Sequence, residues 1–187
     1  MNLPPDWQNR NVTRGPFAIP RPPRRKVFVS YHHGRDQFWF NHFTNQFSEQ
    51  FEVFQDRSLD EAVDSDDMDY VNRVIREDYI AGSSATIVLC GNETWKRRFV
   101  DWEIASTLHH EHALLGILVP GTTVGPSRKY LVPDRLYDNV QSGYAAFAVE
   151  WPSSPDQLGS LIEAALRESV LKSLIRNDRA RMRINLP

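Results

Sequence analysis

The sequence predicts an α/β fold in which helices cover both faces of a five-stranded parallel sheet. Two observations predict it: short apolar runs alternate along the chain with amphipathic helical patterns, and the runs are apolar at consecutive positions, as in strands buried on both faces. With five strands, we expect the order 2-1-3-4-5 of flavodoxin-like three-layer folds. Ligands of such folds bind at the carboxyl ends of the strands, near the point where the strand order reverses.

Order is predicted to begin with the β-branched and aromatic run Lys26–Tyr31, which is typical of a buried strand. A helix is predicted over Asp36–Gln50, with Asp36 as its N-cap. Its phenylalanines recur near helical spacing and should pack on the core. These are Phe38, Phe40, Phe43, Phe47 and Phe51.

The next elements are predicted from shorter patterns. Val53 and Phe54 form a brief second strand, and a polar, acidic loop follows over 58–67. A second helix is expected over 68–79. The clearest strand in the chain is Ala85–Cys90, which ends at Gly91.

The second half continues the alternation. Thr94 is predicted to cap a helix over 95–110, and Leu114–Val119 forms the fourth strand. The residues 121–139 are predicted to be a long loop of the kind that carries specificity. The last two elements are a strand over 145–149 and a helix over 156–175.

Charge divides the chain into a domain and two basic ends. We expect a Pro- and Arg-rich N-terminal tail over 1–25, one domain over 26–176 and a basic C-terminal tail over 177–187. The formal net charge is −2, which does not favour a nucleic-acid binder. We therefore expect no nucleic-acid partner.

The sequence also predicts the compartment. Its single cysteine, Cys90, lies in an apolar run and cannot form an intrachain disulfide. No window resembles a membrane span, and the first 25 residues have no apolar segment of the signal-peptide type. We expect a cytoplasmic protein with no membrane partner.

Several common functions of such folds are excluded by missing motifs. The first strand is followed by His32-His33-Gly34-Arg35, which is neither a P-loop nor a dinucleotide fingerprint. No G-x-S-x-G serine is present, and Cys90 stands where a phosphoacceptor module carries aspartate. The run 109–112 (HHEH) lacks zinc-ligand spacing, so a solvated helix end is favoured and no metal site or bound cofactor is predicted.

One glutamate stands out by its place on the predicted helix 95–110. At about 100° per residue, Val100, Ile104 and Leu108 form the buried arc, and Glu103 lies on its flank. A carboxylate there is either functional or half of a structural ion pair, for example with Arg98, and the pattern alone leaves both open. Trp102 should point away from the core, as a candidate for self-assembly.

Three stretches carry a resemblance to a known family. Lys26–Tyr31 resembles the first strand of Toll/interleukin-1 receptor (TIR) domains, and 53–56 (VFQD) is similar to the strand that leads into their BB loop. The third stretch, 83–94, is followed by 95–104 (WKRRFVDWEI). Together they are similar to the TIR-like domain of ThsB proteins of bacterial Thoeris anti-phage defence, over about residues 26–151.

The resemblance implies an NAD-cleaving enzyme. The essential glutamate of catalytic TIR domains maps onto Glu103, and Phe99 stands one turn earlier, where many relatives have tryptophan. NAD+ is then a substrate, and no other cofactor is implied. The expected wall of the nucleotide site consists of Ser30, Tyr31, His32, Asp56 and Arg57, with Phe99 beside the catalytic Glu103.

The resemblance also implies partners. The product is an ADP-ribose-derived signal, either a cyclic ADP-ribose isomer or a conjugate, that activates an effector protein. Assembly into a homo-oligomer or filament and a phage-derived trigger are expected. Two alternatives remain open: a non-catalytic TIR-like assembly module, and another N-glycosidase or deoxyribosyltransferase, which also works one carboxylate against an anomeric carbon.

Overall fold

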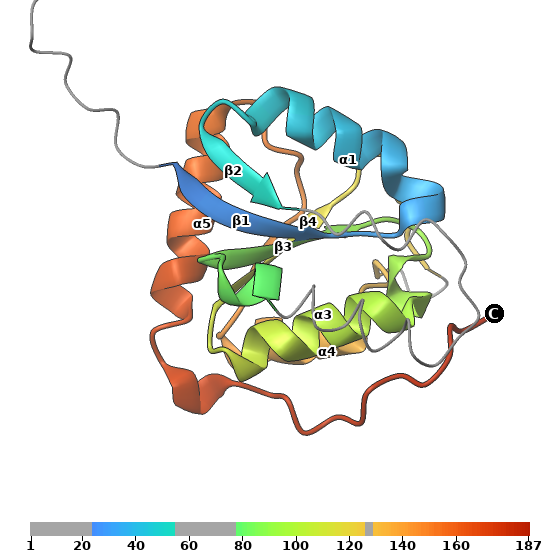
Figure 1. The fold of residues 1–187 in the computed structure, drawn as a ribbon. Helices are drawn as coiled ribbons and strands as arrows, with labels where there is room; N and C mark the ends of the chain where they lie inside the picture. Colours follow the sequence, from blue (N-terminus) through green and yellow to red (C-terminus); the bar gives the residue numbers. More distant parts are fainter. Residues whose placement is uncertain (1–23, 55–77, 126–128) are drawn as a thin grey trace, which may run out of the picture.

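The computed structural model describes residues 24–54, 78–125 and 129–187 (Figure 1). They form an α/β fold whose five strands are all parallel in the order β2-β1-β3-β4-β5, as the sequence predicts. Every residue of the central strands β3 and β4 is buried, which agrees with their uninterrupted apolar sequences. The strands are β1 (Arg25–Ser30), β2 (Phe51–Phe54), β3 (Ala85–Cys90), β4 (Ala113–Leu118) and β5 (Ala146–Ala148).

Helices cover both faces of the sheet, giving the three layers that the sequence predicts (Figure 1). On one face, Phe43 of α1 (His33–Phe47) and Leu158 of α5 (Pro155–Glu168) share a core cluster with the strands. On the other face, α3 (Arg98–His109) and α4 (Asp134–Ser142) complete a second cluster. Alternate strand residues point to opposite faces, so β3 and β4 contribute side chains to both clusters.

The first helix begins three residues earlier than predicted. His32, not Asp36, is the N-cap, and its Nδ1 accepts a hydrogen bond from the amide of Gly34 at 3.2 Å. Asp36 lies in the first turn with its side chain buried. The predicted aromatic stripe is only partly right, because Phe38 is 69% exposed and Phe51 belongs to β2, while Phe40, Phe43 and Phe47 are buried.

The helix after β3 is also shorter than predicted. A 3-10 turn, η2 (Thr94–Lys96), precedes α3, and Arg97 rather than Thr94 is the N-cap of α3. The Thr94 hydroxyl is buried and bonds to Asp36 instead. The buried arc of Val100, Ile104 and Leu108 is confirmed.

Two predictions in the second half need correction. The long loop expected over 121–139 ends at α4, which begins directly after Pro133, a residue predicted to lie in the loop. The last helix, α5, ends at Glu168 rather than 175, and a short turn, η3 (Lys172–Leu174), follows. The predicted loop 58–67 lies outside the described residues, as does most of the predicted helix 68–79.

The predicted C-terminal tail has a defined path. Residues 177–187 contain no helix or strand, and they contact α4 and α3 and end near the start of α3 (Figure 1). Within the described residues, no helix is long and apolar enough to cross a membrane.

Candidate functional site

Glu103 projects from the middle of α3 and is 4% exposed. Its neighbours on the helix, Val100 and Ile104, pack against Val88 and Cys90 of β3. The backbone oxygen of Glu103 accepts a hydrogen bond from the Thr107 hydroxyl at 2.8 Å. The glutamate is therefore held on a helix that is fixed to the sheet, with its carboxyl group almost fully removed from water.

Ser30 lies on the same face of the sheet as α3. It is the last residue of β1 and pairs in register with Val88, which packs against α3. Paired residues of parallel strands point to the same face. The Ser30 hydroxyl is buried and has no hydrogen-bond partner among the described residues. A buried hydroxyl without a partner costs free energy, which makes it a candidate contact for a ligand on this face.

Phe99 lies one turn before Glu103, as the sequence predicts, and is half-buried. Its ring meets the Trp102 ring edge-on at 5.7 Å between centroids. The Arg98 guanidinium lies 4.5 Å from the centroid of the Phe99 ring. Trp102, predicted to be exposed, is half-buried because the C-terminal segment covers it, and its indole N–H donates to the Met182 carbonyl at 2.7 Å.

Tyr31 lies on the opposite face of the sheet, so the structure does not bring it together with Glu103. Its ring stacks on Phe40 at 4.5 Å and on His33 at 4.3 Å. Its hydroxyl donates to Gln37 at 2.8 Å. Tyr31 thus packs beneath α1 in the first core cluster. Asp56 and Arg57, the other two predicted contacts, lie outside the described residues.

His32 faces a charged cluster at the carboxyl end of the sheet. Burial, and then the charge of Arg97, lowers the pKa of His32 to about 4, so its imidazole is neutral at pH 7. Its Nε2 lies 3.8 Å from a carboxylate oxygen of Glu93, and the same oxygen is 3.6 Å from Arg35. Arg97 approaches this oxygen at 3.4 Å.

Glu93 is the centre of this cluster, and sequence reasoning did not single it out. It joins the segment after β1, which contributes His32 and Arg35, to the segment after β3. The guanidinium Nε of Arg97 is buried and has no hydrogen-bond partner among the described residues. The sequence did contain a signal for Glu93, because it lies just after a central parallel strand, where the ligand crevice of such folds is found.

A second set of polar residues, which sequence reasoning also missed, connects the segment after β1 to the segment after β3 by hydrogen bonds. Thr94 donates a hydrogen bond to Asp36 at 2.8 Å, and its oxygen accepts one from the amide of Gly91 at 2.9 Å. Burial raises the pKa of Asp36, and the Thr94 hydrogen bond opposes that rise. A Cβ at Gly91 would lie 2.6 Å from Cγ of Asp36, so only glycine fits there without a shift.

These two groups border an open cleft of about 350 Å³ at the point where the strand order reverses. The segments after β1, β3 and β4 form its walls, as expected for ligand sites of this architecture. Its lining includes Arg35, Asp36, Asn92, Glu93 and Thr122. Among the described residues, no group of three His, Cys, Asp or Glu side chains is arranged to hold a metal ion.

The fold and the sequence together define the class of protein. The family model described as "Thoeris protein ThsB, TIR-like domain" matches residues 28–124, just over half of the 187 residues. The chain therefore belongs to the family of TIR-like domains of Thoeris ThsB proteins.

One solved structure that matches is that of the TIR domains of the activated Roq1 resistosome, which directly recognizes the pathogen effector XopQ. It is 13% identical, with a TM-score of 0.40, and the match covers 79% of this chain and 84% of that one. No curated protein matches the chain.

Proposed function

We propose that this protein cleaves the bond between nicotinamide and ribose in NAD+ and converts the ADP-ribose moiety into a signal. The observation that carries the proposal is Glu103: a carboxylate that is 4% exposed, on the sheet face that also holds the Ser30 hydroxyl, which has no partner within the described part of the chain. Membership of the Thoeris family supports the same activity.

The chemistry suits a single carboxylate. When the C1′–N bond breaks, its electron pair leaves with nicotinamide, which becomes neutral, so no acid is needed to protonate the leaving group. Positive charge grows on the ribosyl ring, and a buried carboxylate stabilises that charge more strongly than a solvated one. Glu103 is assigned this role, and the Ser30 hydroxyl that of a hydrogen-bond partner for a ribose hydroxyl.

The remaining groups are assigned to binding. The Phe99 ring is suited to stack on the nicotinamide or on the adenine. Arg97 and Arg35 carry guanidinium groups at the carboxyl end of the sheet, where they would bind the diphosphate. The neutral His32 beside them is a hydrogen-bonding group rather than a charge at pH 7.

The nucleophile that attacks the ribosyl centre decides the product. Water gives ADP-ribose, whereas a ribose hydroxyl or adenine nitrogen of the same molecule gives a cyclic isomer. An external amine or imidazole gives a conjugate. We propose one of the latter two products, which would activate an effector protein. Self-assembly of TIR-like domains after a phage-derived trigger would complete the active form in the cytoplasm.

The test is mass spectrometry of nucleotides from phage-challenged cells that carry the wild type, Glu103→Gln or Glu168→Gln. The first substitution is nearly isosteric and removes the charge, and the second makes the same change at an exposed position on α5. We expect a new ADP-ribose-derived species with the wild type and Glu168→Gln only. If Glu103→Gln gives the same species, the carboxylate has a structural role. If no protein gives one while defence persists, the chain is an assembly module.

A further inference from the structure

The C-terminal segment 177–186, here called the strap, runs along the outer side of α3 (Figure 1). In the second half of α3, Asn177 donates to the carbonyl of Ala105 at 3.0 Å. In the middle, the amide of Met182 donates to Asp101 at 2.9 Å. Beyond the start of the helix, the amide of Leu186 donates to the carbonyl of Lys96 at 3.0 Å. The strap thus contacts the side of α3 that faces away from the sheet.

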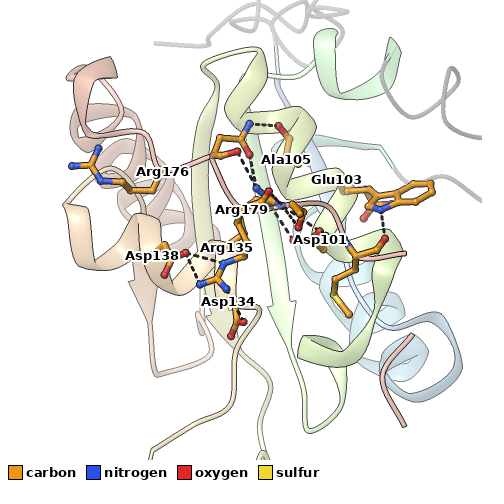
Figure 2. A network of polar contacts seen from close by, with 12 residues as sticks. Asp101, Glu103, Ala105, Asp134, Arg135, Asp138, Arg176 and Arg179 are labelled. Carbon is orange, nitrogen blue, oxygen red and sulfur yellow. Dashed lines mark hydrogen bonds and ion pairs between the residues drawn. The ribbon is translucent and has the colours of Figure 1, made fainter. Parts of the chain in front are cut away.

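The strap is anchored by a buried ion pair between α3 and α4. Arg135 is 1% exposed and Asp101 5%, and the Arg135 Nε lies 3.0 Å from Asp101 Oδ1. The guanidinium also donates to the Asn177 side chain at 2.8 Å and to the carbonyl of Arg179 at 2.8 Å. Figure 2 shows Arg135 and Asp101 inside this network, with Arg179 reaching Asp138 and Asp134.

The burial of this pair depends on the strap, because the strap supplies several of its hydrogen bonds. A buried charged pair is tolerated when its remaining donors and acceptors are satisfied, and removal of those partners is strongly unfavourable. The pairs of Arg179 with Asp134 and Asp138 are more exposed and contribute less. Arg135 therefore couples the position of the strap to that of α3.

The strap also caps α3 at its N-terminus. Arg97, the N-cap residue, makes no side-chain cap hydrogen bond. The amide of Arg98 in the first turn donates instead to the Asn185 side-chain oxygen at 2.9 Å. A polar side chain that accepts from a first-turn amide is the usual stabilising cap, here supplied from a residue 87 positions away. The turn so capped carries Phe99, and the next turn carries Glu103.

We infer that the strap is a positioning element of the active site, in which Arg135 and Asn185 fix α3 and thereby Phe99 and Glu103. This inference rests on the function proposed above. The helix is held on two sides, by the sheet through Val100 and Ile104 and by the strap. Without the strap, the first turn of α3 loses its cap and the buried pair loses its partners, so the catalytic side chains lose their fixed geometry.

The test compares full-length Asn185→Ala, Asn185→Asp and Arg181→Ala proteins. Asparagine to aspartate keeps an acceptor oxygen for the Arg98 amide, and Arg181 is an exposed strap residue that serves as the matched control. Two quantities are measured: hydrogen exchange of the amides of Arg98 and Phe99, and kcat and KM for NAD+ cleavage. The thermal unfolding midpoint checks that every variant is folded at the assay temperature.

We expect Asn185→Ala to speed exchange of these amides and to lower kcat about fivefold with KM unchanged within about twofold, since one cap is lost. Asn185→Asp and Arg181→Ala should behave like the wild type. If exchange speeds up while kcat is unchanged, the strap does not position the site and the inference is wrong. If exchange does not change, Asn185 is not a cap and the inference is again wrong.

A second variant tests the anchor and separates this inference from the proposed function. Arg135→Lys replaces the branched guanidinium by one ammonium group, which cannot satisfy Asp101 and the strap carbonyls together. We expect faster exchange of the Met182 and Leu186 amides and a lower kcat. Should this variant fail to fold, Asn185→Ala still decides the matter. Lower activity together with faster exchange in Asn185→Ala supports the positioning role of the strap. Full activity of Glu103→Gln refutes the proposed function, and it does so independently of the exchange result for Asn185→Ala.

Discussion

The hydrogen bond between Thr94 and Asp36 gives the sharpest stability prediction. Thr94→Val keeps the shape of the side chain and removes the hydroxyl, which is fully buried. The hydroxyl donates to the Asp36 carboxylate at 2.8 Å, lies 3.2 Å from the Leu89 carbonyl and accepts from the Gly91 amide at 2.9 Å, and these contacts are lost. A hydrogen bond to a charged group and a buried amide left unpaired each contribute about 1–3 kcal/mol. We expect the free energy of unfolding to fall by about 2–6 kcal/mol.

Urea unfolding monitored by circular dichroism measures this change, with Thr94→Ser as the control that keeps the hydroxyl. In thermal unfolding, a loss of about 3 kcal/mol corresponds to a midpoint lower by about 6–12 °C for a chain of this size. If Thr94→Val is within about 0.5 kcal/mol of Thr94→Ser, the hydroxyl does not hold the two segments together and the reasoning fails.

The same substitution has a predicted pH dependence. The hydrogen bond favours the charged form of Asp36 and so lowers its pKa against the larger effect of burial, which raises it. The stabilisation by Thr94 is therefore present at neutral pH and is lost as the pH falls and Asp36 is protonated. The difference between Thr94→Val and Thr94→Ser should shrink on acidification, and a difference that grows would contradict the assignment.

Three further predictions concern single residues at the carboxyl ends of β1 and β3. The pKa of His32 is lowered to about 4 in the folded protein. As the pH falls below 6.5, the unfolded chain binds a proton at this residue and the folded protein does not. Up to about 3 kcal/mol of stability is therefore lost between pH 6.5 and 4. His32→Asn, which caps α1 without titrating, should lose less between pH 7.5 and 4.5 in urea unfolding; equal losses would refute this. Gly91→Ala should destabilise by about 1–3 kcal/mol, because its Cβ would lie 2.6 Å from Cγ of Asp36, and an unchanged unfolding midpoint would contradict that. Ser30→Ala should leave stability within about 0.5 kcal/mol, since the hydroxyl has no partner among the described residues, yet raise KM for NAD+; a large loss of stability with unchanged KM would assign Ser30 to the core.

The sequence was sufficient to predict the sheet. The strand Ala85–Cys90 is observed with the predicted bounds, because a run of β-branched and apolar residues that ends at Gly91 has no competing interpretation. The strand order followed from the strand count and the alternation with helices. The family was also predicted correctly, because family resemblance depends on short stretches of local sequence such as 83–94.

The helix caps could not be predicted in the same way. Asp36 and Thr94 are both good N-cap residues by propensity, and both predictions were wrong because the two side chains bond to each other across 58 positions. The cap of α3 comes from Asn185, far along the chain. A side chain's choice between a local cap and a distant partner is a tertiary effect.

The candidate site was predicted in part. The helical wheel placed Val100, Ile104 and Leu108 in the core, which the structure confirms, and put Glu103 on their flank. Strand alternation places the adjacent residues Ser30 and Tyr31 on opposite faces of the sheet, and this deduction was not drawn when both were assigned to one nucleotide site. The pattern could not show that the strap covers Trp102, because an irregular segment leaves no periodic signal.

The most direct test of the central claim is the release of nicotinamide from NAD+ that is isotopically labelled in the nicotinamide ring. Extracts of phage-challenged cells with the wild type, Glu103→Gln or Glu168→Gln at equal protein levels are compared by mass spectrometry. The account predicts labelled free nicotinamide with the wild type and Glu168→Gln, and a loss of at least about 100-fold with Glu103→Gln, the scale of one removed electrostatic stabiliser. Equal release from wild type and Glu103→Gln would contradict it.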